Sequence, residues 1–126
     1  VVDTSGSMSA KQIGMALGSI ASYAAAKDVP FVRIIFCDAK ATDAGYLAPE
    51  DIAGRVKVTG RGGTILQPGV DCLEQANDFP NDGPILIITD GEIENDLKVR
   101  REHAFLLPRG NRLPFRARGE VFYFRE

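Results

Sequence analysis

The feature that most constrains the fold is the opening of the chain, where two β-branched valines run directly into Asp3. Hydroxyl side chains follow at Ser5 and Ser7, and a pattern typical of a helix begins shortly afterwards. Gly6 permits a tight turn because it has no Cβ. The opening therefore predicts a strand, a sharp loop and a helix, with three oxygen-bearing side chains at the end of the strand.

This set of side chains has two interpretations. One carboxylate with two neutral hydroxyls suits a hard divalent cation such as Mg²⁺ or Mn²⁺, which prefers oxygen ligands. Zinc fits poorly, because no Cys or His is adjacent. The alternative is a plain helix N-terminus, with Ser7 or Ser9 as the N-cap and the remaining residues as a turn.

The rest of the chain alternates between apolar runs typical of strands and apolar stripes of helical period. The expected elements are helices at 10–27 and 67–77, a short helical start at 49–53, strands at 31–36, 85–88, 103–107 and 121–124, and an edge strand within 39–48. The runs at 31–36 and 85–88 are almost wholly apolar, as in strands that are buried on both faces. We therefore predict an α/β fold, a three-layer Rossmann-like sandwich around a mostly parallel sheet of five or six strands with one antiparallel edge strand.

This topology predicts where the polar residues gather. Right-handed crossovers place the carboxyl ends of parallel strands at one edge of the sheet, where open α/β sheets bind ligands. Asp3, Thr64 and Asp90 are expected in loops at that edge, with the strand at Val1 beside the strand from Ile85. Thr64 closes a glycine-rich run that lacks the lysine of a phosphate-binding loop. Asp38 also follows a strand, and we interpret it as a turn or cap residue.

Composition limits the function classes. The chain has 126 residues, enough for one domain, and its net charge of −2 gives no indication of nucleic acid or membrane binding. Cys37 and Cys72 lie in apolar patterns and are expected to be buried free thiols, which favours the reducing cytoplasm. The lone His103 is expected to be a packing or surface residue. The arginines at 109, 112, 116 and 118 are expected to form a solvated face or to pair with the acids at 92–96.

Three motifs together resemble the von Willebrand factor type A (VWA) domain with its metal-ion-dependent adhesion site (MIDAS). They are Asp3-Thr4-Ser5-Gly6-Ser7, Gly62-Gly63-Thr64 and Thr89-Asp90-Gly91, in the family's order of D-x-S-x-S, then Thr, then Asp. The resemblance implies a metal ion bound by the hydroxyls of Ser5, Ser7 and Thr64, with Asp3 and Asp90 acting directly or through water. It implies Mg²⁺, or else Mn²⁺ or Ca²⁺, with an open position for an Asp or Glu of a protein partner.

The resemblance also implies a context. Residues 1–126 would form one VWA-like domain of the bacterial intracellular type, as the C-terminal part of a longer protein with a truncated first strand. Some such domains follow a metallopeptidase-like region, and others belong to chelatase or AAA-ATPase systems. The chain departs from the family in a short, polar connection after Asp90, where a fuller helix is expected.

These features favour a cytoplasmic, metal-dependent protein-protein interaction module that is not an enzyme. The alternative enzyme is a Mg²⁺-dependent phosphohydrolase with Asp3 as nucleophile. Such haloacid-dehalogenase-like enzymes usually carry a second acid two residues later, where this chain has Ser5, and a lysine in a suitable loop, which is missing. A third possibility is a VWA-like fold with a purely structural role and an empty metal site.

Overall fold

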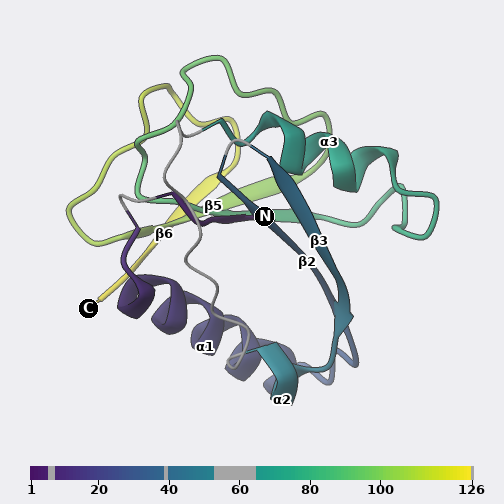
Figure 1. Cartoon of the computed structure of the whole chain (residues 1–126). Coiled ribbons are helices and arrows are strands. Elements are labelled where there is room, and N and C mark those ends of the chain that lie inside the picture. The colour runs from purple at the N-terminus through teal and green to yellow at the C-terminus, as the bar shows by residue number, and fades with distance from the viewer. Residues whose placement is uncertain (6–7, 39, 53–64, 126) are drawn as a thin grey trace.

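The structure is a computed structural model that describes residues 1–5, 8–38, 40–52 and 65–125. Within these ranges, six strands form one sheet with the order β3-β2-β1-β4-β5-β6, and helices cover both of its faces (Figure 1). The elements are β1 (Val2–Asp3), α1 (Ala10–Ala26), β2 (Val32–Cys37), β3 (Ala41–Leu47), α2 (Pro49–Ile52), α3 (Gln67–Gln75), β4 (Ile85–Ile88), β5 (His103–Pro108) and β6 (Glu120–Phe124).

The sheet has the predicted topology. All neighbouring strands pair in parallel except β2 and β3, which are antiparallel at one edge. The short β1 lies in the middle of the sheet, where Val2 pairs with Phe36 of β2 on one side and with Ile88 of β4 on the other. The α/β class, the mostly parallel sheet, the antiparallel edge and the pairing of the first strand with β4 are all confirmed.

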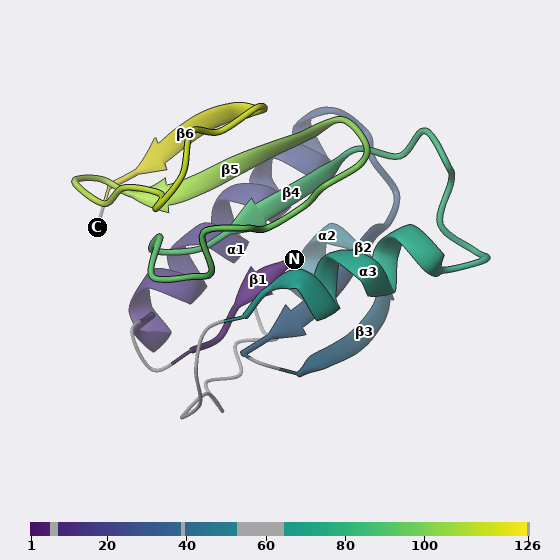
Figure 2. The same ribbon diagram turned by 90° about the horizontal axis from the view of Figure 1, so that it is seen from above.

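The two faces of the sheet are covered differently. In Figures 1 and 2, α1 and α2 lie on one face and α3 on the other. The α1 face buries Ile13 and Leu17 against a core that includes Val2 and Phe36. On the other face, the core around α3 includes Val70 and Leu73.

The boundaries of α1 follow from local hydrogen bonds. Ser9 Oγ accepts a hydrogen bond from the backbone N–H of Gln12 at 3.1 Å, and Gln12 Oε1 accepts one from the N–H of Ser9 at 3.0 Å. This reciprocal capping box confirms Ser9 as the N-cap. The helix ends at Ala26, one residue earlier than predicted, and α3 ends at Gln75, two residues earlier than predicted.

Two long connections cover the α3 face without forming helices in the described residues. The segment between β4 and β5 is irregular, yet Ile93, Leu97 and Val99 pack against the same core as α3. The segment between β5 and β6 packs Leu113 and Phe115 there. The predicted polar connection in place of a fuller helix after Asp90 is confirmed, and three apolar residues of this irregular segment pack on the core without a helical or strand pattern.

A cluster centred on Arg33 joins β2, β3 and the loop after α3. Its guanidinium group makes two hydrogen bonds to the carboxylate of Asp43, at 2.9 and 2.5 Å, and a third to Asp78 Oδ1 at 2.7 Å. The Tyr46 hydroxyl donates to the carbonyl oxygen of Asp78 at 2.6 Å, and the Arg33 guanidinium lies 5.0 Å from the centre of the Tyr46 ring. These hydrogen bonds lower the pKa of the Asp43 carboxyl.

Replacing Arg33 with methionine is expected to lower the free energy of unfolding at pH 7 by about 1–2 kcal/mol. The substitution removes the two hydrogen bonds to Asp43 and the one to Asp78, and the loss stays modest because both carboxylates are partly exposed to water. Urea denaturation measures the change. Since the pKa of Asp43 is lowered in the folded state, the stabilising effect exists above the unfolded pKa and is lost as the pH falls through the folded value. The difference between the two proteins should therefore shrink in acid. An equal loss of stability in the exposed Arg118→Met would contradict the attribution of this effect to the hydrogen bonds of Arg33.

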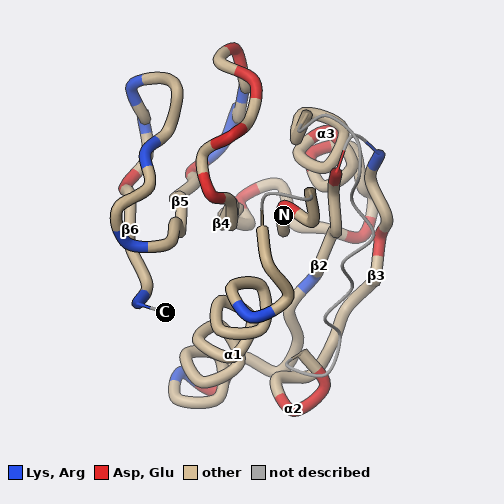
Figure 3. The backbone as a smooth tube through the Cα atoms, turned by 60° about the vertical axis from the view of Figure 1, so that its left-hand side comes forward, with Lys and Arg blue, Asp and Glu red and all other residues tan. Residues whose placement is uncertain are grey.

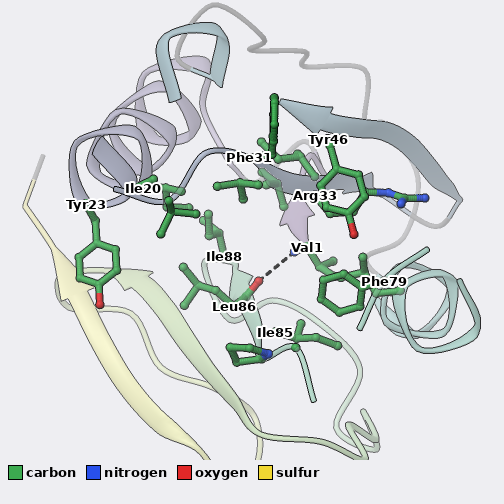
Figure 4. Close-up of a pocket in the computed structure, with 18 of the residues that line it drawn as sticks. Val1, Ile20, Tyr23, Phe31, Arg33, Tyr46, Phe79, Ile85, Leu86 and Ile88 are labelled. Atoms are coloured by element: carbon green, nitrogen blue, oxygen red, sulfur yellow. Dashed lines mark hydrogen bonds between the residues drawn. The ribbon is translucent and has the colours of Figure 1, made fainter. Parts of the chain in front are cut away.

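The amino ends of the strands border an apolar pocket of about 460 Å³ between α1, β2 and β4 (Figure 4). Ile20, Phe31 and Leu86 are among its lining residues, and the nitrogen of Val1 donates to the carbonyl oxygen of Leu86 at 2.8 Å. This pocket lies at the end of the strands opposite Asp3 and Asp90. None of the helices in the described ranges is long and apolar enough to cross a membrane.

Candidate metal centre

The candidate site begins with Asp3, which ends β1 in the middle of the sheet. Its register partner on β2 is Cys37, and its side chain is fully buried. The residue after Asp3 is also held against β2, because the N–H of Thr4 donates to the carbonyl oxygen of Cys37 at 2.9 Å. A carboxylate is thereby held at the carboxyl edge of a parallel sheet, the edge where α/β folds bind ligands.

Hydrogen bonds fix both oxygens of this carboxylate. Asp3 Oδ1 accepts from the backbone N–H of Ser5 at 2.9 Å, and Asp3 Oδ2 accepts from the hydroxyl of Thr89 at 2.7 Å. The Thr89 oxygen in turn accepts from the N–H of Gly91 at 3.1 Å. The end of β1 and the turn after β4 are therefore joined through one buried polar chain.

The second carboxylate is Asp90, which follows β4 and is only 5% exposed. Its Oδ1 accepts from the backbone N–H of Glu92 at 3.0 Å, so the side chain is bound to its own turn. Its carbonyl oxygen accepts from Asn111 Nδ2 at 2.9 Å, which ties this turn to the segment after β5. Gly91 continues the turn with a φ of +92°, a conformation that favours glycine.

The electrostatics of the pair suit a cation. Burial raises the pKa of Asp3, hydrogen bonds from Ser5 and Thr89 act in the opposite direction, and the charge of Asp90 raises it further. In the described part of the chain both salt bridges belong to Arg33, so no basic side chain compensates either carboxylate. A divalent ion beside them would supply the missing positive charge.

The predicted ligand set is only partly described. Asp3, Ser5 and Asp90 come together at one edge of the sheet, whereas Ser7 and Thr64, with its glycine-rich run, lie outside the described residues. Across the described ranges, no cluster of three or more His, Cys, Asp or Glu side chains is placed to hold a metal. The expected set has only two such side chains and otherwise consists of hydroxyls, so it differs in kind from such clusters.

Two other predictions about polar residues can be compared with the structure. Asp38 Oδ1 accepts from the backbone N–H of Lys40 at 3.1 Å, which confirms a turn residue. His103 is half-buried, and its ring meets the edge of Phe105 with ring centroids 5.5 Å apart, which confirms a packing residue.

The hydrogen bonds of three residues in the site region were not predicted from the sequence. Thr89 and Asn111 bind Asp3 and Asp90 as described above, and Glu94 binds the start of α3. Its carboxylate accepts from the backbone N–H groups of Leu66 at 2.9 Å and Gln67 at 3.0 Å. A carboxylate favours a helix N-terminus, and Leu66 at the N-cap has no side-chain acceptor. Only Thr89, a hydroxyl between an apolar strand and an acid, carried a signal in the sequence.

Comparisons with known proteins agree with this architecture. Residues 1–101 match the VWA-like domain family (DUF2201). The matched region runs from β1 through β4 and ends before β5, which begins at His103. No curated protein matches the chain, and neither does a solved structure.

Proposed function

Because this chain belongs to the VWA-like domain family (DUF2201), we propose that it is a metal-dependent protein-protein interaction module and not an enzyme. The proposed ligands are those of the MIDAS pattern, namely Asp3, Ser5, Ser7, Thr64 and Asp90. The ion is Mg²⁺, with Mn²⁺ or Ca²⁺ as alternatives, and a Glu or Asp of a protein partner completes its coordination.

The observation that carries this proposal is the pair of buried acids, Asp3 and Asp90, at the ligand-binding edge without a basic partner among the described residues. Keeping two uncompensated carboxylates buried and close together is costly in a site with a purely structural role. Their presence supports a role in which a cation arrives and neutralises them.

The residues contribute in different ways. Asp3 already accepts hydrogen bonds from Ser5 and Thr89, so we assign it the tasks of orienting the Ser5 backbone and supplying negative charge. Asp90 uses Oδ1 for the N–H of Glu92, which fixes its position at the edge of the sheet. Ser5, Ser7 and Thr64 are neutral, and an ion held by few charges keeps its affinity for an incoming carboxylate.

The cysteines bear on the compartment. Both are free thiols, and Cys37 is buried as expected, but the expectation of burial was wrong for Cys72, which is only half-buried. Burial raises the pKa of Cys37 to about 11, so it stays a protonated, unreactive thiol at neutral pH. Free thiols fit a reducing environment, and we therefore place this module in the cytoplasm.

The proposal predicts that Asp90→Ala removes both metal binding and partner capture while the fold persists. Isothermal titration calorimetry with Mg²⁺ and Mn²⁺ measures the first, and a pull-down from cell lysate with and without EDTA measures the second. Glu92→Ala is the matched control, because Glu92 is an exposed acid whose backbone, not its side chain, bonds Asp90. It should bind the metal and the same partners as the wild type.

Two results would contradict the proposal. One is an unchanged metal affinity in Asp90→Ala, which would place the ion elsewhere. The other is a set of captured proteins that does not respond to EDTA, which would remove the metal from recognition.

A further inference from the structure

Three arginines surround a shallow hollow at the carboxyl end of β5 and β6. The hollow has a volume of about 460 Å³ and includes Arg109, Arg112, Arg125 and the exposed ring of Tyr123. We refer to Arg109, Arg112 and Arg125 as the arginine patch. All three lie beyond the 101 residues that match the VWA-like family, so the family match assigns them no role.

The charge of this patch is not neutralised by the described part of the chain. The only salt bridges there belong to Arg33, so the expected pairing of this basic run with the acids at 92–96 is not made, and the solvated-face interpretation holds. Residues 103–119 contain no acid at all. Figure 3, which colours the backbone by residue type, shows basic positions along the β5 and β6 segments and acidic positions along the neighbouring connection after β4.

The patch adjoins the candidate metal centre directly. Asn111, which lies between two of the arginines, donates to the carbonyl oxygen of Asp90 at 2.9 Å. Gly91 approaches the backbone of Arg112 so closely that a Cβ at Gly91 would lie 1.9 Å from the Arg112 oxygen. The turn that carries the arginines therefore packs on the turn that carries Asp90.

The backbone that carries the patch is held in place. The N–H of Arg109 donates to the carbonyl oxygen of Phe124 at 2.9 Å, and the N–H of Asn111 donates to that of Pro108 at 3.1 Å. Arg125 follows Phe124 at the end of β6, so the hydrogen bond between Arg109 and Phe124 also holds the backbones of Arg109 and Arg125 close together. Three long cationic side chains thus extend from fixed points into solvent.

From this arrangement we propose that the arginine patch binds acidic side chains that flank the metal-binding carboxylate of a protein partner. This inference rests on the proposed function, since it extends the same binding edge. Guanidinium groups bind carboxylates through paired hydrogen bonds, which suits Arg better than Lys for this task. A short acidic segment fits better than a nucleic acid, because the chain has a net charge of −2 and acids lie on the adjacent connection.

The test uses the full chain and a fluorescein-labelled short polyglutamate peptide, with binding followed by anisotropy in Mg²⁺. The variant R109Q/R112Q/R125Q should weaken binding by about tenfold, because each exposed ion pair contributes modestly. The matched control is R100Q/R116Q/R118Q, which removes the same charge from exposed arginines that do not line the hollow. The control should bind the peptide within about twofold of the wild type, and added salt should reduce the difference.

The outcomes separate this inference from the proposed function. If the patch variant binds Mg²⁺ and the peptide as the wild type does, the arginine patch has no part in recognition. An equal loss in the control would have the same meaning, since net charge alone would explain binding. Tighter binding of a labelled oligothymidine than of the peptide would replace the acidic partner with a nucleic acid. If instead calorimetry detects no metal in the wild type, while the patch variant alone loses the peptide, the proposed metal function fails and the patch stands.

Discussion

Replacing Gly91 with alanine is expected to destabilise the protein by about 3–5 kcal/mol, which approaches the whole stability of a small domain. Two costs add at this position. The φ of +92° disfavours any residue with a side chain. The new Cβ would also lie 1.9 Å from the oxygen and 2.7 Å from the carbonyl carbon of Arg112, which are backbone atoms that no side-chain rotation can move away. Urea or thermal denaturation measures the loss.

Gly110→Ala is the matched control for this substitution. Gly110 has a nearly identical φ of +95°, but a Cβ there meets nothing within 4 Å. Its variant should therefore show the conformational cost alone, about 1–2 kcal/mol. If the two variants lose the same stability, the close approach of Gly91 to Arg112 does not constrain the fold.

The sequence predicted the sheet because its signals are local. The apolar runs that became β2 and β4 sit between turn residues and can be read without knowing their partners. Between these strands lies a helix, indicated by the apolar stripe that includes Ile13 and Leu17, and right-handed crossovers of this kind make the strands parallel. Because residues that follow parallel strands lie at the same edge of the sheet, Asp3 and Asp90 were correctly placed together there.

The contacts that shape the site could not be predicted in the same way, because they join distant segments. Thr89 bonds Asp3 across 86 positions in sequence, and Glu94 bonds the N–H of Leu66 across 28. Neither pairing leaves a periodic pattern. The two irregular connections on the α3 face were equally hidden, because isolated residues such as Ile93 and Leu113 bury themselves without any helical or strand period.

The second large effect concerns the buried acid itself. Asp3→Asn is expected to raise the stability of the protein in EDTA by about 1 kcal/mol, a typical gain when a functional constraint is relieved. Burial raises the pKa of Asp3 in the folded state above its ordinary value of 3.8. As the pH rises from 3.8 toward the folded pKa, the unfolded chain loses its proton first, so the wild type loses stability over that window and does not regain it above. Asparagine carries no charge and avoids this loss.

In Mg²⁺ the order of the two proteins should reverse. An ion bound at a hundred times its dissociation constant stabilises the folded wild type by about 2.7 kcal/mol, and the variant should gain nothing. Thermal unfolding of both proteins in EDTA and in Mg²⁺ measures the two differences. Asp38→Asn is the matched control, since Asp38 is a half-buried acid at the end of β2 that lies outside the proposed ligand set. If Mg²⁺ still stabilises Asp3→Asn, the Asp3 carboxylate does not hold the ion. If the wild type is more stable than the variant in EDTA, the hydrogen bonds of Asp3 outweigh the cost of burying its charge.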